Sequence, residues 1–427
     1  MLDTRFLYHP AETPVMKVIK DSVHDHIQID GIARDLIDTP PLQRLRRIKQ
    51  LGTVSLVYPS ANHTRFEHSL GVYHLACNAL EQLGVDGQLG KRVQAAALLH
   101  DVGHGPFSHN LESLTYRRTG RYHDDVHDLL AEGDVGDALR DHDLDPAAVA
   151  DLVAGDGRFG QLISGELDVD RMDYLVRDAH HTGVPYGTID HGRLVRELSF
   201  VDGELVLAEG NVQTAESLLV ARALMNPTVY SHSVARISKA MLRRAGERLL
   251  EQTETDAATL QRMDDHDLVA ALRSNPETAE YSRRLDNRDL YKRAVWAEID
   301  DVPGGIIEAD HDSIREFEHE IAAEADVDSE AVILDVPDRP SMTESTSRVM
   351  VNGDVRSLGQ QSPLVDALRG SQYSQWRLGV YSPADSSVRV GRAALDVLGL
   401  DIDGPLVSDV RDGLYTTLDQ FVGDSSD

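Results

Sequence analysis

Apolar residues recur at helical spacing over more than half of the chain. One amphipathic stripe is formed by Leu36, Leu42, Leu45 and Ile48. A second helix is expected to begin near Thr64 and to continue to Leu83, and the apolar run from Ala95 to Leu99 indicates a buried helix. Helical spacing resumes from Thr214 to Leu250. The pattern therefore predicts a mainly helical protein up to about residue 300.

Strand signals interrupt this pattern once before residue 300 and repeatedly after it. Asp202-Gly203 favours a hairpin turn within Ser199 to Ala208, and the polar segment Glu254 to Glu277 indicates a solvated helical excursion without chemistry. Later segments predict a helix over 313–325, a strand over 331–336, a hairpin at Asn352-Gly353, a strand over 377–381 and a helix over 391–398. We therefore expect a mainly α protein, with a helical domain carrying a small β-hairpin over 1–299, a smaller α+β module over 300–422 and a disordered tail over 423–427.

The composition is strongly acidic and poor in lysine. The formal net charge is −30, and only 6 of the 42 basic residues are lysine. This composition is typical of a cytoplasm at multimolar salt, and the alternative is an ordinary acidic cytosolic protein. The charge argues against nucleic acid as the main partner, because binding a polyanion relies largely on cationic side chains. In high salt, where the Debye length falls to about 3 Å, local basic clusters could still hold a phosphate.

A single cysteine and the hydropathy pattern exclude several classes of protein. Cys77 alone allows neither an intrachain disulfide nor a cysteine-rich zinc site. The first ten residues lack the apolar region of a signal peptide, and no apolar run approaches the roughly 20 residues that cross a bilayer. We expect a soluble, cytoplasmic protein with no membrane partner.

The stretch from His100 to His109 places three histidines and one aspartate within ten positions. The adjacent pair His100 and Asp101 offers an imidazole nitrogen and a carboxylate oxygen to one divalent cation. Gly103 and Gly105 are expected to let the backbone turn tightly, so that the next two histidines face the same space. This stretch is the strongest indication of chemistry in the chain.

Further residues extend the stretch into a family pattern. His68 precedes it, an acidic run from Asp168 to Asp173 follows it, and the order H…HD…D is the ligand signature of the HD phosphohydrolase superfamily. The chain also resembles the deoxynucleoside triphosphate triphosphohydrolases, in particular the sterile-alpha-motif-and-HD-domain type and its microbial relatives. The motifs that carry this resemblance are Ile37 to Pro40, Gln43 to Arg46, Lys49 to Gly52 and Arg65 to His68. The match extends from about Lys17 to about Met241, with the HD core at about 50–180.

The resemblance implies a metal centre and a group of catalytic residues. The implied ligands of a divalent ion (Mn, Zn, Fe or Mg) are His68, His100, Asp101 and Asp170. The implied catalytic group is His104, His109, His123 and Asp124, the last standing where the family usually has glutamate. Of these, His109 is the first candidate to protonate the leaving 5′-oxygen and His104 the second. A solvated loop histidine is the alternative for His123.

The same resemblance implies a nucleotide pocket. Arg65, Arg171 and Tyr174 would hold a triphosphate, a role that suits the forked donors of arginine. Helical spacing puts Asp170, Tyr174 and Asp178 along one stripe. The implied sugar and nucleotide contacts are Gln50, Leu51, Asp178, Arg222 and Tyr230. For Leu51 and Tyr230, plain core packing remains an alternative interpretation.

A regulatory site is also implied by the resemblance. In the animal enzymes a guanine nucleotide is held by residues that match Lys17, Val18, Asp38, Gln43 and Arg46. The alternative for Asp38 is a local role in the turn before Pro40. A second activator site departs from the family pattern at Ser233, Ala208 and Gly210. We expect a homo-oligomer, either a dimer or a tetramer.

The resulting hypothesis is metal-dependent hydrolysis of a dNTP to deoxynucleoside and triphosphate, with a guanine nucleotide such as GTP as activator. One alternative is an HD phosphohydrolase acting on a nucleoside monophosphate or a signalling nucleotide. Such an enzyme shares the metal site, so only Gln50, Leu51 and Tyr230 distinguish it. The other alternative is a nucleotide sensor without catalysis, which would have no need of the retained histidines.

Overall fold

The computed structural model describes residues 17–341, 346–402 and 404–407. Its contacts divide the chain into two compact units, each assembled from segments that are distant in sequence. The first unit comprises Met1–Met225, Glu254–Ala270 and Thr343–Ser362. The second comprises Asn226–Thr253, Ala271–Met342 and Pro363–Asp427. The expected tail at 423–427 lies outside the described residues.

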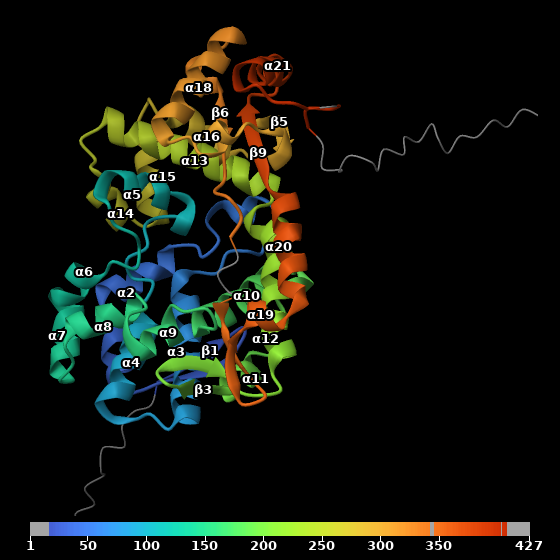
Figure 1. Ribbon diagram of the computed structural model, residues 1–427. Helices are drawn as coiled ribbons and strands as arrows, with labels where there is room; N and C mark the ends of the chain where they lie inside the picture. The colour runs from blue at the N-terminus through green and yellow to red at the C-terminus, as the bar shows by residue number, and fades with distance from the viewer. Residues whose placement is uncertain (1–16, 342–345, 403, 408–427) are drawn as a thin grey trace, which may run out of the picture. The chain divides into compact units, whose positions relative to one another are not determined.

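The first unit is helical with two small sheets (Figure 1). Its early elements are β1 Lys17–Asp21, β2 Asp25–Ile29, α1 Gly31–Ile37, α2 Pro40–Arg44, η1 Leu45–Arg47, η2 Gly52–Leu56, α3 Arg65–Leu83, α4 Gly87–Leu99, η3 Ser108–Asn110, α5 Glu112–Thr119, α6 His127–Ala131, α7 Gly133–Asp141, α8 Pro146–Val153 and α9 Gly157–Ile163. Its later elements are α10 Val169–Thr182, η4 Pro185–Gly187, α11 His191–Arg196, β3 Leu198–Val201, β4 Glu204–Leu207, α12 Val212–Met225, α14 Ala257–Arg262, β7 Arg348–Val351, β8 Asp354–Ser357 and α19 Leu358–Gln361. Helix α15, Asp265–Ser274, begins in this unit and ends in the second.

The second unit is an α+β unit around a three-stranded antiparallel sheet of order β5-β9-β6. Its elements are the π-helical turn η5 Asn226–Tyr230, α13 Ser233–Gln252, α16 Ala279–Asp286, β5 Lys292–Glu298, η6 Ile299–Asp301, α17 Gly304–Ile307, α18 His311–Glu324, η7 Ser329–Ala331, β6 Ile333–Asp335, α20 Pro363–Gln375, β9 Arg377–Ser382 and α21 Ser387–Leu398. Its core holds Val295, Leu378 and Val380 from the strands and Ile321 and Val390 from the helices.

Local sequence explains where the site-bearing helices begin and end. Helix α3 begins after Thr64, whose backbone N–H donates to the Glu67 carboxylate at 2.6 Å, and it ends at Gly84 in the left-handed conformation. Helix α10 begins after Asp168, whose side chain accepts from the backbone N–H of Arg171 at 2.7 Å. The expected helix from Thr64 to Leu83 is therefore confirmed, and Asp170, Tyr174 and Asp178 lie on one helix, as their spacing indicated.

Two expected hairpins are present, but one has an unexpected partner. The turn at Asp202-Gly203 joins β3 to β4, and the turn at Asn352-Gly353 joins β7 to β8. Strand β7 pairs in parallel with β4, giving a four-stranded sheet of order β3-β4-β7-β8. The second hairpin therefore belongs to the first unit, although it was expected within a C-terminal module.

The division of the chain differs from the expected boundary at 299/300. Strand β5 begins at Lys292, which already pairs with Ser382 of β9. The α+β sheet therefore starts before that boundary. The expected helix from Thr214 to Leu250 is interrupted by η5. Pro227 lies in that turn, and proline removes a backbone donor and crowds the preceding helical turn.

The expectation of a solvated excursion over Glu254 to Glu277 is wrong for its central part. Asp264 and Asp265 are 3% and 4% exposed. The Asp265 carboxylate accepts from the backbone N–H of Lys49 at 3.0 Å and from that of Phe107 at 2.6 Å. Asp265 therefore links two backbone segments that are distant in sequence, a contact that the local sequence pattern does not indicate.

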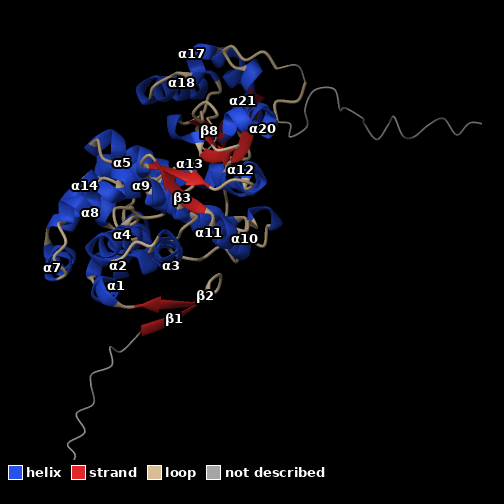
Figure 2. Cartoon of the chain, turned by 60° about the horizontal axis from the view of Figure 1, so that its bottom comes forward, coloured by secondary structure: helices blue, strands red, loops and turns tan. Residues whose placement is uncertain are grey.

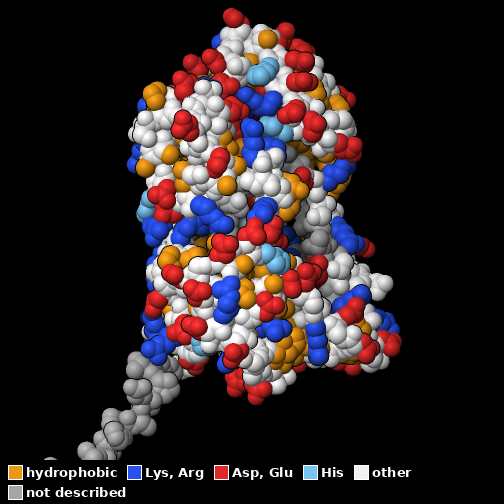
Figure 3. All heavy atoms as spheres, turned by 90° about the vertical axis from the view of Figure 1, so that its left-hand side faces the viewer, with side chains coloured by type: hydrophobic (Ala, Val, Ile, Leu, Met, Phe, Trp, Pro, Cys, Tyr) orange, Lys and Arg blue, Asp and Glu red, His pale blue; other side chains and the backbone are white. Residues whose placement is uncertain are grey.

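Figure 3 shows acidic side chains spread across the visible face, with arginine and lysine between them. Within the described part of the chain, no helix is both long and apolar enough to span a bilayer.

Candidate active site

Three helices of the first unit deliver four potential metal ligands to one point. His68 is the fourth residue of α3, and Asp170 lies in the first turn of α10. His100 and Asp101 directly follow the end of α4. His68 Nε2 is 3.3 Å from His100 Nε2 and 2.8 Å from Asp170 Oδ1. His100 Nε2 is 3.4 Å from Asp101 Oδ1. The structure thus brings together all four residues that the resemblance implied.

The hydrogen bonds of the two imidazoles show that these residues fit a divalent cation. His100 Nδ1 donates to the Ala97 carbonyl at 2.8 Å, and His68 Nδ1 donates to Asp173 Oδ2 at 2.7 Å. Each ring therefore directs the lone pair of its Nε2 inward. Two such lone pairs at 3.3 Å repel each other unless positive charge lies between them. Two imidazoles and two carboxylates supply the mixed nitrogen and oxygen donors that Zn, Mn and Fe accept.

Arg65 holds Asp101 in place. Its Nη1 donates to both Asp101 oxygens at 3.0 and 2.9 Å, and its Nε donates to Ser108 Oγ at 2.9 Å. Arg65 is 4% exposed and Asp101 1%. Burial alone would raise the pKa of Asp101, but the Arg65 guanidinium, with His100 and His104, holds that pKa well below its usual range. Asp101 is therefore an anion, as a metal ligand requires.

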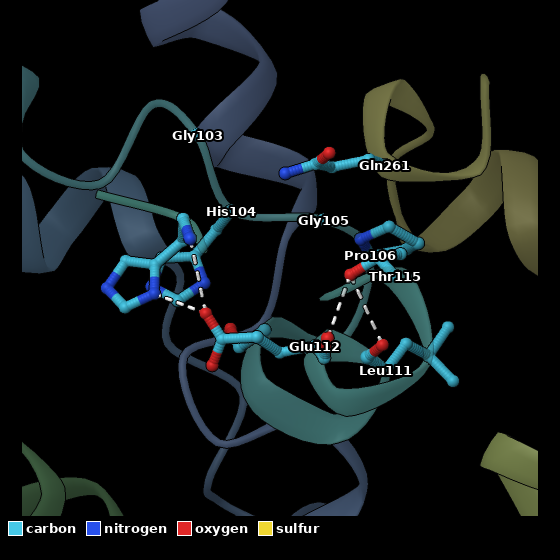
Figure 4. Close-up of a pocket in the computed structure, with 10 residues that line it drawn as sticks. Gly103, His104, Gly105, Pro106, Leu111, Glu112, Thr115 and Gln261 are labelled. Atoms are coloured by element: carbon cyan, nitrogen blue, oxygen red, sulfur yellow. Dashed lines mark hydrogen bonds and ion pairs between the residues drawn. The ribbon is translucent and has the colours of Figure 1, made fainter. Parts of the chain in front are cut away.

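A second cluster, His104, His109, Glu112 and His123, lies directly beside this centre. The rings of His104 and His123 stack with centroids 3.9 Å apart, and His109 meets His104 edge-on at 4.7 Å. Glu112 accepts from His109 Nδ1 at 2.7 Å through one oxygen and from His123 Nδ1 through the other. Figure 4 shows the Glu112 carboxylate directed at the imidazoles beside a cavity of about 10 Å³, the size of one water. His104 Nε2 lies 3.3 Å from Asp101 Oδ1, which joins the cluster to the metal centre.

The three histidines of this cluster have different proton affinities. Burial, reinforced by the charge of Arg65, holds the pKa of His104 well below its ordinary value. The pKa of His109 is also lowered, first by desolvation, although its side chain remains 52% exposed and Glu112 acts in the opposite direction. For His123, burial would lower the pKa, but the hydrogen bond and charge of Glu112 raise it above its ordinary value. Of the three histidines, His123 is therefore the most basic.

Although the four side chains lie close enough to hold an ion, their geometry is better suited to moving a proton. Their candidate ligand atoms lie within 4.8 Å of one another. However, both Glu112 oxygens already accept from imidazole N–H groups, and the stacked rings of His104 and His123 direct their lone pairs along parallel planes. Convergent lone pairs are what a metal site needs. We interpret the cluster as a proton-transfer network.

The comparisons with known proteins agree with this arrangement. The chain is 35% identical over 381 residues to an uncharacterized protein of Methanocaldococcus jannaschii, a match that covers 87% of this chain and 80% of that protein. It is 32% identical over 248 residues to the deoxynucleoside triphosphate triphosphohydrolase SAMHD1 homolog of Dictyostelium discoideum, covering 53% of this chain and 48% of the relative. The crystal structure of a phosphohydrolase from Bacteroides thetaiotaomicron covers 86% of this chain and 99% of its own, at a TM-score of 0.69 and 27% identity. The HD domain family matches residues 65–178, and the HD associated region matches residues 189–409, about half of the chain.

The chain belongs to the HD phosphohydrolase family. It is a metal-dependent phosphohydrolase with the mainly helical fold expected from its sequence.

The carboxylate of the histidine cluster is not the one that the sequence analysis named. Among the described residues, the cluster contains Glu112, and Asp124 is not one of its members. Asp124 follows His123 in a turn, where its backbone carbonyl accepts from Val126 at 3.0 Å. Glu112 is the first residue of α5, and the turn that follows the helix at Gly120 returns the chain so that His123 meets it. The carboxylate of the cluster is therefore Glu112, from a different element than Asp124.

The expected turn is present over residues 101–103, where the His104 N–H donates to the Asp101 carbonyl at 3.0 Å, and Gly103 in addition permits a close approach. A Cβ at Gly103 would lie 2.0 Å from the His123 carbonyl oxygen, so only glycine lets the His123 loop pack here. The left-handed backbone falls instead on Phe107 and Ser108, at φ of 56° and 57°. The backbone N–H of Phe107 donates to the Asp265 carboxylate, and Ser108 Oγ donates to the Lys49 carbonyl at 2.6 Å. These contacts sustain a strained segment between His104 and His109.

The structure brings Arg171 and Tyr174, both expected at the triphosphate, near Arg222, which was expected as a nucleotide contact. Burial raises the pKa of Tyr174 to about 12, and the nearby charges of Arg222 and Arg171 act against that rise. Arg171 also forms an ion pair with Asp168, which fixes it to the start of α10. The phenol of Tyr174 on α10 therefore lies within electrostatic reach of two guanidinium groups.

The residues expected to contact the sugar differ in burial and do not all lie in the same unit. Gln50 is 7% exposed, and its side-chain oxygen is a buried acceptor without a hydrogen-bond partner in the described part of the chain. Its backbone N–H donates to the His63 carbonyl at 3.0 Å, and His63 Nε2 lies 2.8 Å from Asp178 Oδ1. Leu51 is half-buried just before η2. Tyr230 ends η5 in the second unit, so its position relative to the others is not assigned.

The five residues expected at the regulatory site form one surface of the first unit. Lys17 Nζ donates to Asp38 at 3.0 Å, and Arg46 Nε donates to Gln43 Oε1 at 2.9 Å. Gln43 Nε2 also donates to the carbonyl of Ile37, the neighbour of Asp38, at 2.7 Å, which joins the two pairs. Val18 is 46% exposed. The Asp38 side chain thus faces Lys17 and not the turn that follows it.

Proposed function

We propose that this HD phosphohydrolase hydrolyses deoxynucleoside triphosphates to deoxynucleoside and inorganic triphosphate. The observation that carries the proposal is the contact between the two clusters, with His104 Nε2 3.3 Å from Asp101 Oδ1. Cleavage at the α-phosphorus needs an activated water on one side and a proton for the 5′-oxygen on the other. The adjacent clusters offer one group for each task.

In this proposal His68, His100, Asp101 and Asp170 hold a divalent cation. Such a cation lowers the pKa of water and neutralises phosphate charge. Arg65 keeps Asp101 ionised and oriented, and its buried charge adds to the positive field at the reacting phosphate. Contact between Arg65 and a phosphate oxygen is part of the proposal.

His109 is proposed to protonate the leaving 5′-oxygen. Its half-exposed ring is the accessible member of the cluster, whereas His104 is 1% exposed and its pKa is held too low for an acid at neutral pH. Glu112 accepts from both His109 and His123, and its negative charge opposes the desolvation that lowers the pKa of His109, which favours the protonated imidazole that an acid needs. His104, whose Nε2 lies 3.3 Å from Asp101 Oδ1, then serves as a neutral polar group between the clusters.

The nucleotide is proposed to lie along α10. Arg171, Tyr174 and Arg222 would hold the β- and γ-phosphates through their positive charge and hydroxyl donor. Gln50 and Asp178 would bind the sugar, because the buried oxygen of Gln50 needs a donor such as a hydroxyl. Leu51 would fill the space of a 2′-hydroxyl. Recognition of a dNTP by the named Dictyostelium relative supports this choice over other nucleotides.

The site of cleavage can be tested with isotope-labelled water. Attack at the α-phosphorus forms one P–O bond to water and breaks the bond to the 5′-oxygen, which takes the proton. Each dNTP incubated with Mn²⁺ in H₂¹⁸O should therefore yield intact triphosphate carrying the label, and unlabelled deoxynucleoside. Release of pyrophosphate or single phosphates would instead favour an HD phosphohydrolase with another substrate.

A guanine nucleotide is proposed to activate the enzyme at Lys17, Val18, Asp38, Gln43 and Arg46. Asp38 can accept from the N1–H and N2–H of guanine, whereas adenine presents an acceptor at N1. GTP should therefore raise the rate or promote assembly, ATP should not, and Asp38→Ala should remove the response. Leaving buried polar groups unpaired costs about 1–3 kcal/mol, roughly a five- to hundred-fold preference.

Stability should hardly change in this variant, because the Lys17–Asp38 pair is exposed and such pairs contribute about 0–1 kcal/mol. Rate and sedimentation measurements with GTP and ATP provide the readout. Asp35→Ala, on the same helix and exposed, is the matched control. Equal responses of wild type and Asp38→Ala to GTP would remove Asp38 from a regulatory site.

A further inference from the structure

His24, in the turn between β1 and β2, reaches the residue that orients a metal ligand. Its side chain is 2% exposed, although the hairpin that carries it lies at the edge of the first unit (Figure 2). His24 Nε2 is 2.7 Å from Asp173 Oδ1, and Asp173 Oδ2 accepts from His68 Nδ1 at 2.7 Å. The two histidines therefore contact opposite oxygens of one carboxylate.

Asp173 is completely buried and fully occupied by donors. Arg177 Nε donates to its Oδ2 and Arg177 Nη2 to its Oδ1, both at 2.9 Å. A Cβ at Gly71 of α3 would lie 1.8 Å from Asp173 Oδ1, so the missing side chain makes room for the carboxylate. With two donors on each oxygen, the carboxylate plane is determined by His24, Arg177 and His68 together.

The hairpin fixes its own turn to the same network. Asp21 Oδ1 accepts from the backbone N–H of Val23 at 2.9 Å and of His24 at 2.8 Å. Asp21 also accepts from Arg177 Nη1 at 2.9 Å. The ring of His24 packs against His74 at 5.1 Å and His191 at 5.3 Å between centroids, which restricts its rotation. A surface hairpin is thereby tied at two points to the interior of the metal centre.

We propose that His24 is a positioning residue for the metal ligand His68, acting through Asp173. The inference rests on the proposed role of His68 as a ligand. When His24 donates to Oδ1, the other oxygen of Asp173 stays in the plane that holds the Nδ1–H of His68, and His68 then presents Nε2 to the cation. Loss of such an outer partner of a ligating histidine typically weakens metal binding by about 10–100-fold.

Two substitutions of equal length separate the hydrogen bond from packing. His24→Gln keeps an N–H donor at similar reach, whereas His24→Met fills the space without a donor. Metal-free protein titrated with Mn²⁺, in the absence of nucleotide, should bind nearly as tightly in the Gln variant as in wild type. In the Met variant Mn²⁺ binding should be about 10–100-fold weaker. His26→Met on the exposed face of the same hairpin is the control and should bind as wild type.

Thermal melting of the metal-free proteins accompanies the titration. Wild-type affinity in His24→Met, or equal losses in the Gln and Met variants, would overturn the proposal. Failure of the Met variant to fold while the Gln variant folds would also overturn it, because the hydrogen bond would then serve the fold. Since no nucleotide is present, a substrate other than a dNTP would leave these measurements unchanged.

Discussion

Replacing Asp170 by asparagine is expected to abolish hydrolysis and to leave the purified protein without its divalent cation, while the fold persists. Asp170 is the ligand candidate with the most exposed side chain, at 32%, and its contacts are to His68 and His100. Asparagine keeps its size but loses the charge that a cation needs. The loss of activity should exceed the roughly 10–100-fold effect of an outer-shell change. Elemental analysis and thermal melting give the two readouts, and wild-type metal content would remove Asp170 from the ligand group.

Asp101→Ala should lose metal and activity equally but, unlike Asp170→Asn, should also lose stability. Arg65 is 4% exposed and its Nη1 binds Asp101 alone. Removing the aspartate leaves a buried, uncompensated guanidinium, which typically costs about 3–5 kcal/mol. Asp101→Asn, which keeps an acceptor for Arg65, should recover part of that stability without recovering metal. Equal melting temperatures for wild type and Asp101→Ala would contradict this interpretation of the ion pair.

Replacing His109 by alanine is expected to lower kcat by about 10²- to 10⁴-fold, the usual contribution of a general acid. Metal content should not change, because His109 contacts Glu112 and the other histidines and none of the four ligand candidates. A substrate whose leaving group needs no proton should lose much less activity, and this difference is the decisive measurement. An equal loss for both kinds of substrate would exclude His109 as the acid.

Glu112→Gln should move the pH dependence of the same step. Glu112 raises the pKa of His123, so the protonated cluster persists above the ordinary histidine pKa and is lost as pH rises through the raised value. Without the carboxylate charge, desolvation dominates and the pKa of His123 falls. The alkaline limb of kcat should therefore shift to lower pH in Glu112→Gln. As a control, Asp125→Asn replaces a nearby exposed acid and should leave the pH profile of kcat unchanged. If the alkaline limb of kcat stays at the same pH in Glu112→Gln, His123 does not take part in catalysis.

The sequence by itself determined the helices and the candidate metal ligands. The apolar residues from Thr64 to Leu83 and before His100 recur with the period of a helix. This period is a local property of the chain, so it indicates both helices directly. The H…HD…D order can likewise be found in the sequence alone, and each of its residues lies at or near a helix end. The helices need only neighbours a few positions away, and the ligands were implied by resemblance to a known family pattern, so both could be predicted before any contact between distant segments was known.

Only the tertiary structure decided which side chains support these residues. Glu112 meets His123 because the chain returns after α5, and Asp124 is not a member of the cluster among the described residues. The carboxylate that orients His68 binds His24 across 149 residues, and Asp265 braces Lys49 and Phe107 from a segment that looked solvated. The hairpin at Asn352-Gly353 joins the first unit through pairing with β4. Glu112, Asp173 and Asp265 are charged residues, which local patterning assigns to solvent, and each is stabilised by partners that are adjacent only after folding.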